Sequence, residues 1–265
     1  MRVIPVIILF VLSALSAPVI AHRGQAAAVA TCSLSWVGTE SAIEEFLRTA
    51  DIQRLEDVPI GVTKPRRAVF TPGGPVTRAA WKALAPSYRT GFRESYKAEI
   101  AAYLLDRMLD LHMVPPVVER KIDRSAGAMI YWIENTKMWD IKKPPVGPEP
   151  KWSEQVSRMK MFDQLTANID RNAGNMLYDD DWHLFLIDHS RAFIERKDLK
   201  GIAAPNRIDK AVWTKMDALT KESLQTALGE WLSLKEIDAL LARRDRMRDA
   251  INKSVAANGA GNVFF

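Results

Sequence analysis

Two segments, IDRNAGNML at residues 169–177 and LIDHS at residues 186–190, carry the clearest indication of how this chain folds. Asp170 and Asn175 stand five positions apart among turn-forming residues, and Asp188 directly follows four apolar residues. The apolar runs on either side of the intervening acidic turn predict a β-hairpin, with Asp170 and Asn175 at its entrance and Asp188 at its exit. Because the two ends of a hairpin are neighbours in space, these three side chains are expected to converge.

Convergent carboxylate and amide groups of this kind suit phosphoryl transfer. One carboxylate can orient an attacking hydroxyl, while an amide oxygen and a second carboxylate hold a divalent ion against phosphates. Taken alone, residues 170–175 would be an ordinary polar turn, and residues 179–181 form a hairpin tip in preference to a calcium site, because the glycine-centred calcium loop is missing. Whether residues 170–175 have a structural or a functional role therefore depends on which residues lie upstream.

A lysine and a glutamate lie upstream in the order that a nucleotide site needs. Lys82 lies in an expected strand at residues 76–84, and Glu99 borders the apolar stripe of a helix expected to begin near residue 96. A helix packed on a sheet would turn Glu99 inward, where a carboxylate is rarely left unpaired, so Lys82 is its expected partner. Considered singly, Lys82 would be a surface lysine and Glu99 a solvent-facing helix charge.

The segment AEIAAYLLDRMLDLHMVPPVVER at residues 98–120 is similar to the helix and following strand of the secretory-pathway kinases of the Golgi casein-kinase type. Those kinases share a fold with the phosphatidylinositol 3- and 4-kinases and their bacterial relatives. The loop that begins Asp170-Arg171 resembles their catalytic loop, and the matching segments cover residues 61–193. The resemblance implies an α+β, two-lobed protein-kinase-like fold, with a small antiparallel-sheet N-lobe containing one helix and a mainly helical C-lobe.

The resemblance also implies a role for each residue of the set. Lys82 would hold the phosphates of ATP, Glu99 would fix Lys82, Asp170 would be the catalytic base, and Asn175 with Asp188 would bind Mg²⁺ or Mn²⁺. Three further candidates for nucleotide binding, two in a basic segment that would cover the phosphates and one at the end of a strand, are Lys64, Arg66 and Glu134.

The implied function is an ATP-dependent kinase that transfers the γ-phosphoryl group to a hydroxyl of a protein, lipid or small-molecule acceptor. Two alternatives stay open, namely an exported pseudokinase or nucleotide-binding module without turnover, and a nucleotidyl (AMP) transferase with ATP reversed in the cleft. The sequence departs from the kinase pattern by having Asp188-His189-Ser190 in place of Asp-Phe-Gly, and His189 is a candidate to touch the site. A single cysteine, Cys32, excludes an intrachain disulfide.

Composition and the first residues bear on partners and location. A net charge of +5 suits an anionic ligand but is too small to indicate nucleic acid, and the basic run at residues 243–248 is interpreted as a solvated helix face. The uncharged stretch at residues 3–21 after Arg2 predicts a secretory signal peptide and hence an exported protein. An uncleaved membrane anchor over residues 3–21 is the alternative.

The expected organisation has four parts: a signal peptide or anchor at residues 1–30, the N-lobe at 31–140, a proline-rich connection at 141–152, and the helical C-lobe at 153–265. Expected strands lie at residues 59–63, 68–71, 76–84, 117–123 and 128–134. Expected helices lie at residues 41–50, 153–168, 211–219, 221–228 and 234–254, and Ser153 is the expected cap of the second of these.

Overall fold

The computed structural model describes residue 34 and residues 36–58, 65–89 and 92–265, all of which belong to one compact unit, Thr31–Phe265. The expected signal segment, the expected strand at residues 59–63 and the candidate Lys64 lie outside the described residues. Within the described part of the chain, no helix has both the length and the apolar character needed to cross a membrane.

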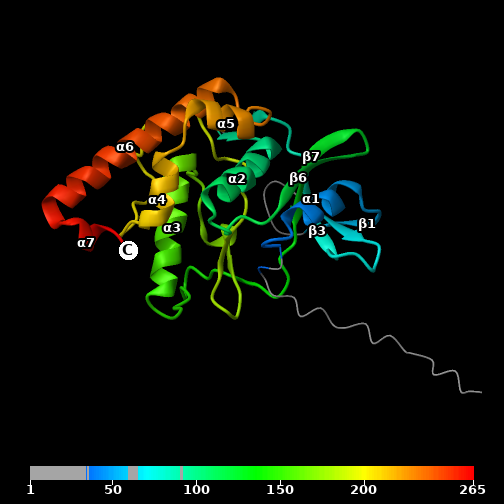
Figure 1. Ribbon diagram of the computed structural model, residues 1–265. Coiled ribbons are helices and arrows are strands. Elements are labelled where there is room, and N and C mark those ends of the chain that lie inside the picture. Colours follow the sequence, from blue (N-terminus) through cyan, green and yellow to red (C-terminus); the bar gives the residue numbers. More distant parts are fainter. Residues whose placement is uncertain (1–33, 35, 59–64, 90–91) are drawn as a thin grey trace, which may run out of the picture. The chain divides into compact units, whose positions relative to one another are not determined.

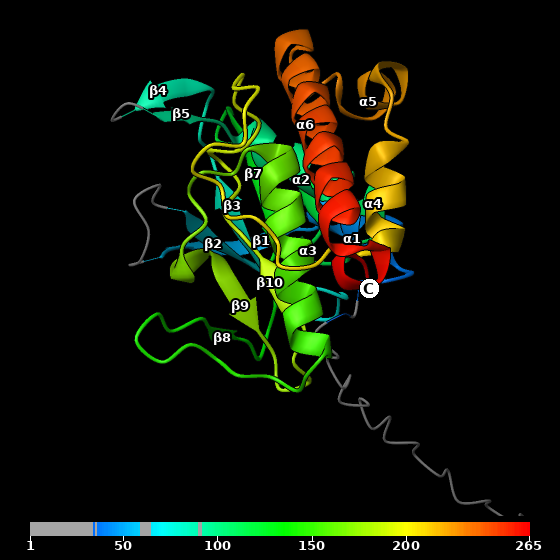
Figure 2. The same cartoon turned by 90° about the vertical axis from the view of Figure 1, so that its left-hand side faces the viewer.

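Helices and strands follow in an order that places most strands before most helices (Figures 1 and 2). The helices are α1 (Glu40–Thr49), α2 (Tyr96–Leu109), α3 (Lys151–Thr166), α4 (Lys210–Asp217), α5 (Lys221–Leu228), α6 (Leu234–Asn258) and α7 (Ala260–Val263), with a 3-10 turn, η1 (Ala173–Asn175). The strands are β1 (Ile52–Asp57), β2 (Arg66–Phe70), β3 (Arg78–Lys82), β4 (Ser87–Arg89), β5 (Phe92–Glu94), β6 (Val117–Ile122), β7 (Ser125–Tyr131), β8 (Lys137–Met138), β9 (Met176–Tyr178) and β10 (Leu184–Leu186).

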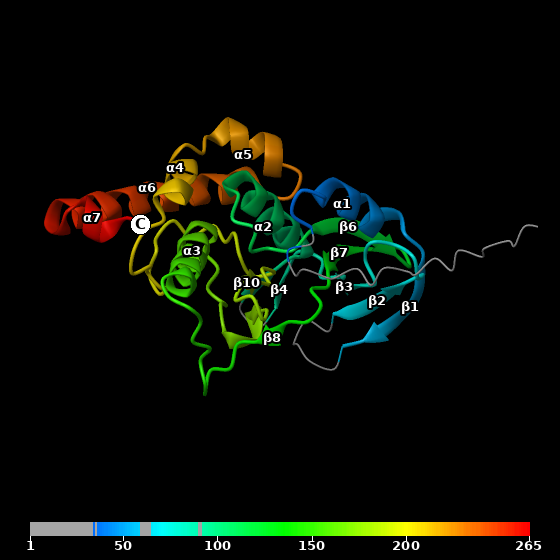
Figure 3. The same ribbon diagram turned by 60° about the horizontal axis from the view of Figure 1, so that its bottom comes forward.

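A five-stranded antiparallel sheet in the order β1-β2-β3-β7-β6 carries the first part of the site. Alternate residues of β7 enter two different apolar clusters, because successive side chains of a strand point to opposite faces. Met129 and Tyr131 pack with Ile43 of α1, whereas Ala128 and Ile130 pack with residues of α2. The two helices therefore cover opposite faces of the sheet, and Figure 3 shows α1 beside β6 and β7.

This alternation decides where the lysine of β3 points. Lys82 is paired with Ala128 in the register between β3 and β7. Side chains directly opposite each other on antiparallel strands lie on the same face, so Lys82 points to the face that α2 covers. A shift of one residue would turn it to the α1 side.

Helix α3 packs against α6 and β10, and α6 also contacts α4, α5 and α7 (Figure 1). Arg243 of α6 is fully buried, which corrects the interpretation of residues 243–248 as a solvated face. Its guanidinium donates to the carbonyls of Leu165, Ile194 and Arg196, and so ties α6 to the end of α3 and to the loop after β10. A buried cation is tolerated here because several carbonyl groups replace its water.

Several local predictions need correction. Helix α3 begins at Lys151 after Pro150, so Ser153 lies within its first turn and its hydroxyl donates to the carbonyl of Pro150 instead of capping the helix. Strand β1 and the β4-β5 hairpin were not expected, because their sequences are mostly polar. The hairpin of β9 and β10 is present as predicted, and β8 adds a third strand to it.

Candidate functional site

The structure brings Lys82, Glu99 and Asp188 together from three separate elements. The Lys82 Nζ atom lies 2.6 Å from Glu99 Oε1 and 2.7 Å from Asp188 Oδ1. Lys82 and Glu99 are almost completely buried, whereas the Asp188 side chain keeps 30% of its surface exposed. The predicted pairing of Lys82 with Glu99 is thus confirmed, and Asp188 is the most exposed member of the trio.

The three groups shift one another's pKa values, and burial raises the pKa of Glu99 despite the nearby ammonium of Lys82. Burial alone would lower the pKa of Lys82, but the charges of Glu99 and Asp188 outweigh burial and raise it. Burial would likewise raise the pKa of Asp188, but the ammonium of Lys82 and the hydroxyl of Ser190 lower it to about 2. A lysine ammonium has three donors, and two of them are used here, so one remains for an anionic ligand.

We expect this low pKa to appear as an acid-sensitive part of the stability. The folded-state pKa of Asp188, about 2, lies below its ordinary value of 3.8, so the unfolded state takes up the proton more readily. The stabilisation, about 2.5 kcal/mol, is complete above about pH 4 and is lost as the pH falls towards 2. Urea unfolding across this range should show the difference between the wild type and Asp188→Asn shrinking with acidity. A difference that stays constant down to about pH 2.5 would contradict the assignment.

The backbone at Asp188 is held in a left-handed conformation, with φ at 58°. A non-glycine residue reaches this region only when its surroundings hold it there. The backbone N–H of His189 donates to Glu99 Oε2 at 2.9 Å, and Ser190 Oγ donates to Asp188 Oδ1 at 2.9 Å. Glu99 therefore fixes both Lys82 and the turn that presents Asp188.

His189 supports this turn from behind instead of facing a ligand. Its ring is fully buried, and its Nε2 atom lies 2.9 Å from Arg171 Nη2. Because a guanidinium can only donate, Nε2 accepts and the imidazole is neutral. Burial and the charge of Arg171 lower the pKa of His189 well below its ordinary value.

Asp170 and Asn175 lie at the entrance of the β9-β10 hairpin, beside its exit at Asp188, as expected. Asn175 Nδ2 donates to the Asp170 carbonyl at 3.1 Å, which leaves the amide oxygen for another partner. The Ile187 N–H donates to the Asn175 carbonyl at 3.1 Å and joins the two ends of the hairpin next to Asp188. The Asp170 carboxylate is 34% exposed, so it can reach a ligand in solvent.

The donor set around Asp188 fits a hard divalent cation. Asp188 Oδ1 accepts from Lys82 and Ser190, while no described residue donates to its Oδ2 atom. The Asn175 amide oxygen is also without a described donor. A carboxylate oxygen and an amide oxygen are ligands that Mg²⁺ and Mn²⁺ accept, and the phosphates of a nucleotide would supply others.

Arg171, which has no predicted role, links α3 to both ends of the β9-β10 hairpin and to His189. Its Nε and Nη2 atoms each lie 3.0 Å from a carboxylate oxygen of Asp163 in α3. Its Nη1 atom donates to the carbonyls of Asn175, at 2.8 Å, and Ile187, at 3.0 Å. Its position directly after Asp170 was the only indication in the sequence that Arg171 belongs to the site. The sequence does not show that Arg171 pairs with Asp163.

Arg191 is a second residue of the site without a predicted role. Its Nη2 atom lies 2.6 Å from Glu94 Oε1 in β5, and its Nη1 atom lies 3.3 Å from Asp170 Oδ2. The guanidinium also stacks over the ring of Phe92, 4.5 Å from its centroid. The unpredicted β4-β5 hairpin thus reaches the candidate base through one arginine.

The remaining nucleotide-binding candidates have other partners in the structure. Glu134 accepts from Arg78 and Thr77; burial would raise its pKa, but these donors lower it. Arg66 at the start of β2 donates to the carbonyl of Leu55. Contact of Glu134 and Arg66 with a nucleotide stays a prediction.

No family model matches the sequence, and no curated protein is significantly similar to it. Solved structures do match. The Golgi casein kinase with Mn/ADP bound aligns with a TM-score of 0.67 at 14% identity, over 86% of this chain and 79% of that one. Hydra Fam20 with sugar aligns with a TM-score of 0.68 at 18% identity, over 85% of this chain and 91% of that one. The protein has a protein-kinase-like fold.

A Helicobacter pylori proinflammatory kinase, CtkA, shares the kinase-like fold more distantly, with a TM-score of 0.50 at 9% identity over 80% of this chain and 98% of that one. Identities this low establish the fold alone. The predicted α+β kinase-like fold is therefore confirmed, while the chemistry has to be argued from the residues of this kinase-like site.

Proposed function

We propose that this protein is a metal-dependent phosphotransferase that moves the γ-phosphoryl group of ATP to a hydroxyl group. The observation that carries the proposal is the bonding of Lys82 to Glu99 and Asp188 at the same time. A buried ammonium between a helix carboxylate and a partly exposed carboxylate is an arrangement that suits the binding of phosphates and a cation beside it. The kinase-like fold supports this class of reaction, and one structural neighbour was solved with Mn/ADP bound.

Each residue of the site has a distinct part in the proposed reaction. Lys82, held by Glu99, donates its free N–H to the phosphates. Asp188 and Asn175 hold Mg²⁺ or Mn²⁺, which neutralises the negative charge on the phosphates when it is bound. Asp170 accepts a hydrogen bond from the hydroxyl of the acceptor and orients it for attack.

Nucleotide binding is the first test of the proposal. ATP with Mn²⁺ at about a hundred times its dissociation constant should raise the melting temperature by roughly 5–10 °C, since ligand binding to the folded state stabilises it by about 2.7 kcal/mol. ATP without a divalent ion should have a much smaller effect. A melting temperature that does not change on addition of Mn²⁺ and ATP would contradict the proposed site.

The mass of the product separates transfer of a phosphoryl group from the alternatives. Incubation of the full chain with ATP, Mn²⁺ and a panel of protein, lipid and sugar acceptors should add one phosphate to an acceptor. Addition of AMP would identify a nucleotidyl transferase instead. Binding of ATP with no product would identify a nucleotide-binding module without turnover.

Location is proposed on the sequence alone. The apolar stretch at residues 3–21 after Arg2 supports export, by a cleaved signal peptide or by an uncleaved anchor. The mass of the mature N-terminus in the native host would distinguish the two.

A further inference from the structure

Arg191 lies beside the candidate base and makes one long contact with it. Its Nη1 atom is 3.3 Å from Asp170 Oδ2, a long contact, whereas Nε and Nη2 lie 2.8 Å and 2.6 Å from Glu94 Oε1. The Arg191 side chain is 15% exposed and that of Asp170 is 34% exposed. The Asp170 end of this guanidinium is therefore the loosely bound end.

The rest of the surroundings hold the guanidinium in place. Glu94 is 3% exposed, and the neighbouring Ser95 N–H donates to the Ser190 carbonyl at 2.9 Å, which joins β5 to the loop that carries Arg191. Burial would lower the pKa of Arg191, but Glu94 and Asp170 raise it. Arg191 is thus a permanent cation whose orientation is set before any ligand arrives.

We propose that Arg191 binds the phosphoryl group while it passes from the nucleotide to the hydroxyl held by Asp170. The inference rests on the proposed phosphotransferase function and adds a residue to it. During transfer, negative charge is spread over the three equatorial oxygens of the phosphoryl group, close to the attacking hydroxyl. The Nη1 atom, at hydrogen-bonding distance from the group that orients this hydroxyl, can donate to one of those oxygens.

The bonds in this step balance without a further reactant. The acceptor oxygen forms a bond to the γ-phosphorus, and the bond between that phosphorus and the β,γ-bridging oxygen breaks, leaving its electron pair on ADP. The proton of the hydroxyl passes to the carboxylate of Asp170 and then to solvent. Arg191 keeps its protons throughout and contributes its positive charge and the hydrogen bond from Nη1.

The neighbouring cations, Arg171 and Lys82, are bonded to other groups. Arg171 uses its guanidinium on Asp163, on two carbonyls and on His189, and its side chain is only 8% exposed. Lys82 is bonded to Glu99 and Asp188 on the side proposed for the other phosphates. Among the residues that the structure describes, Arg191 is the one cation bonded to the Asp170 carboxylate.

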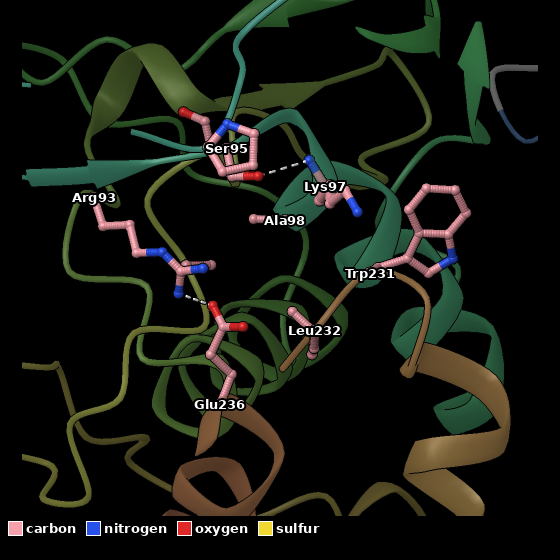
Figure 4. Close-up of a pocket in the computed structure, with 10 residues that line it drawn as sticks. Arg93, Ser95, Lys97, Ala98, Trp231, Leu232 and Glu236 are labelled. Atoms are coloured by element: carbon pink, nitrogen blue, oxygen red, sulfur yellow. Dashed lines mark hydrogen bonds and ion pairs between the residues drawn. The ribbon is translucent and has the colours of Figure 1, made fainter. Parts of the chain in front are cut away.

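Strand β5 also supplies a matched control. Arg93 carries a similar ion pair, with Glu236 at the start of α6, and Figure 4 shows that pair at a pocket lined by Ser95 and Lys97. Arg191→Lys and Arg93→Lys make the same chemical change on two arginines of the same neighbourhood. Of the two arginines, Arg191 is the one whose guanidinium contacts Asp170.

The test compares the binding of ground-state and transition-state ligands by titration calorimetry. ADP with Mn²⁺ should bind Arg191→Lys and the wild type within about twofold of each other. ADP with Mn²⁺ and aluminium fluoride, which mimics the phosphoryl group in transfer, should bind Arg191→Lys at least about 10²-fold more weakly. Glu94→Gln, which releases the guanidinium, should also weaken binding of the aluminium fluoride complex, but by a smaller factor. Arg93→Lys should leave the affinities for ADP and for the fluoride complex unchanged.

Two results would overturn the inference, and they can be told apart. If Arg191→Lys bound the fluoride complex as well as the wild type, or lost ADP and the fluoride complex equally, Arg191 would serve only to fasten the β4-β5 hairpin. If the wild type itself did not bind ADP with Mn²⁺, the proposed function would fail as well. Melting curves of the three variants show whether each is folded, and Glu94→Gln keeps the test decisive if Arg191→Lys does not fold.

Discussion

Replacing Asp188 by asparagine is expected to lower the rate of phosphoryl transfer at least about 10³-fold, because the site loses the carboxylate proposed to bind the metal ion. The substitution preserves the size of the side chain, so Ser190 and Lys82 keep a neighbour of the same shape. The rate should be measured by transfer of radiolabelled phosphate from ATP, with circular dichroism and a melting curve to show that the variant is folded.

Asp217→Asn is the control for this change. Asp217 pairs with Arg248 on an exposed surface, and both side chains are more than a third exposed. Its replacement should leave the rate within about twofold of the wild type, because exposed ion pairs have small effects. Full activity in Asp188→Asn would remove Asp188 from the metal site and with it the proposed mechanism.

Replacing Arg171 by leucine is expected to give the largest loss of stability among these variants, about 3–5 kcal/mol in the free energy of unfolding. The change leaves Asp163 buried without its cation, and the carbonyls of Asn175 and Ile187 lose a donor. Urea unfolding at neutral pH measures the loss. Asp163→Asn in the same chain should restore part of it, because the second change removes the unpaired charge.

The exposed Arg248 is the matched control for Arg171. Arg248→Leu removes an arginine that pairs with Asp217 at the surface, and it should cost less than about 1 kcal/mol. An Arg171→Leu variant no less stable than Arg248→Leu would show that the buried pair contributes nothing to the fold.

The sequence predicts the parts of the fold in which burial and periodicity agree. Helix α2 has an apolar stripe, and the β9-β10 hairpin has two apolar runs separated by a turn, so both were predicted close to their observed positions. The pairing of Lys82 with Glu99 followed from the same reasoning, because an inward-facing carboxylate requires a partner. The positions of Lys82 and Glu99 along their strand and helix were enough to predict that their side chains meet.

The missed features depend on contacts between distant segments. Strand β1 and the β4-β5 hairpin are rich in polar residues, so they lack the alternation that marks a strand with one buried face. Arginine is usually a surface residue, and nothing local shows that Arg171 and Arg243 are buried against carbonyl groups. Glu94, the partner of Arg191 in β5, is 97 positions away in the sequence, so residue spacing could not predict this pair.

The anchoring of His189 bears on how this protein can be regulated. In protein kinases the residue after the metal-binding aspartate can change its packing and so switch the enzyme between active and inactive forms. Here that residue is fully buried, its N–H is bonded to Glu99, and its ring is bonded to Arg171. A switch by inversion of this loop would break both bonds and expose the imidazole, so these contacts oppose such an inversion.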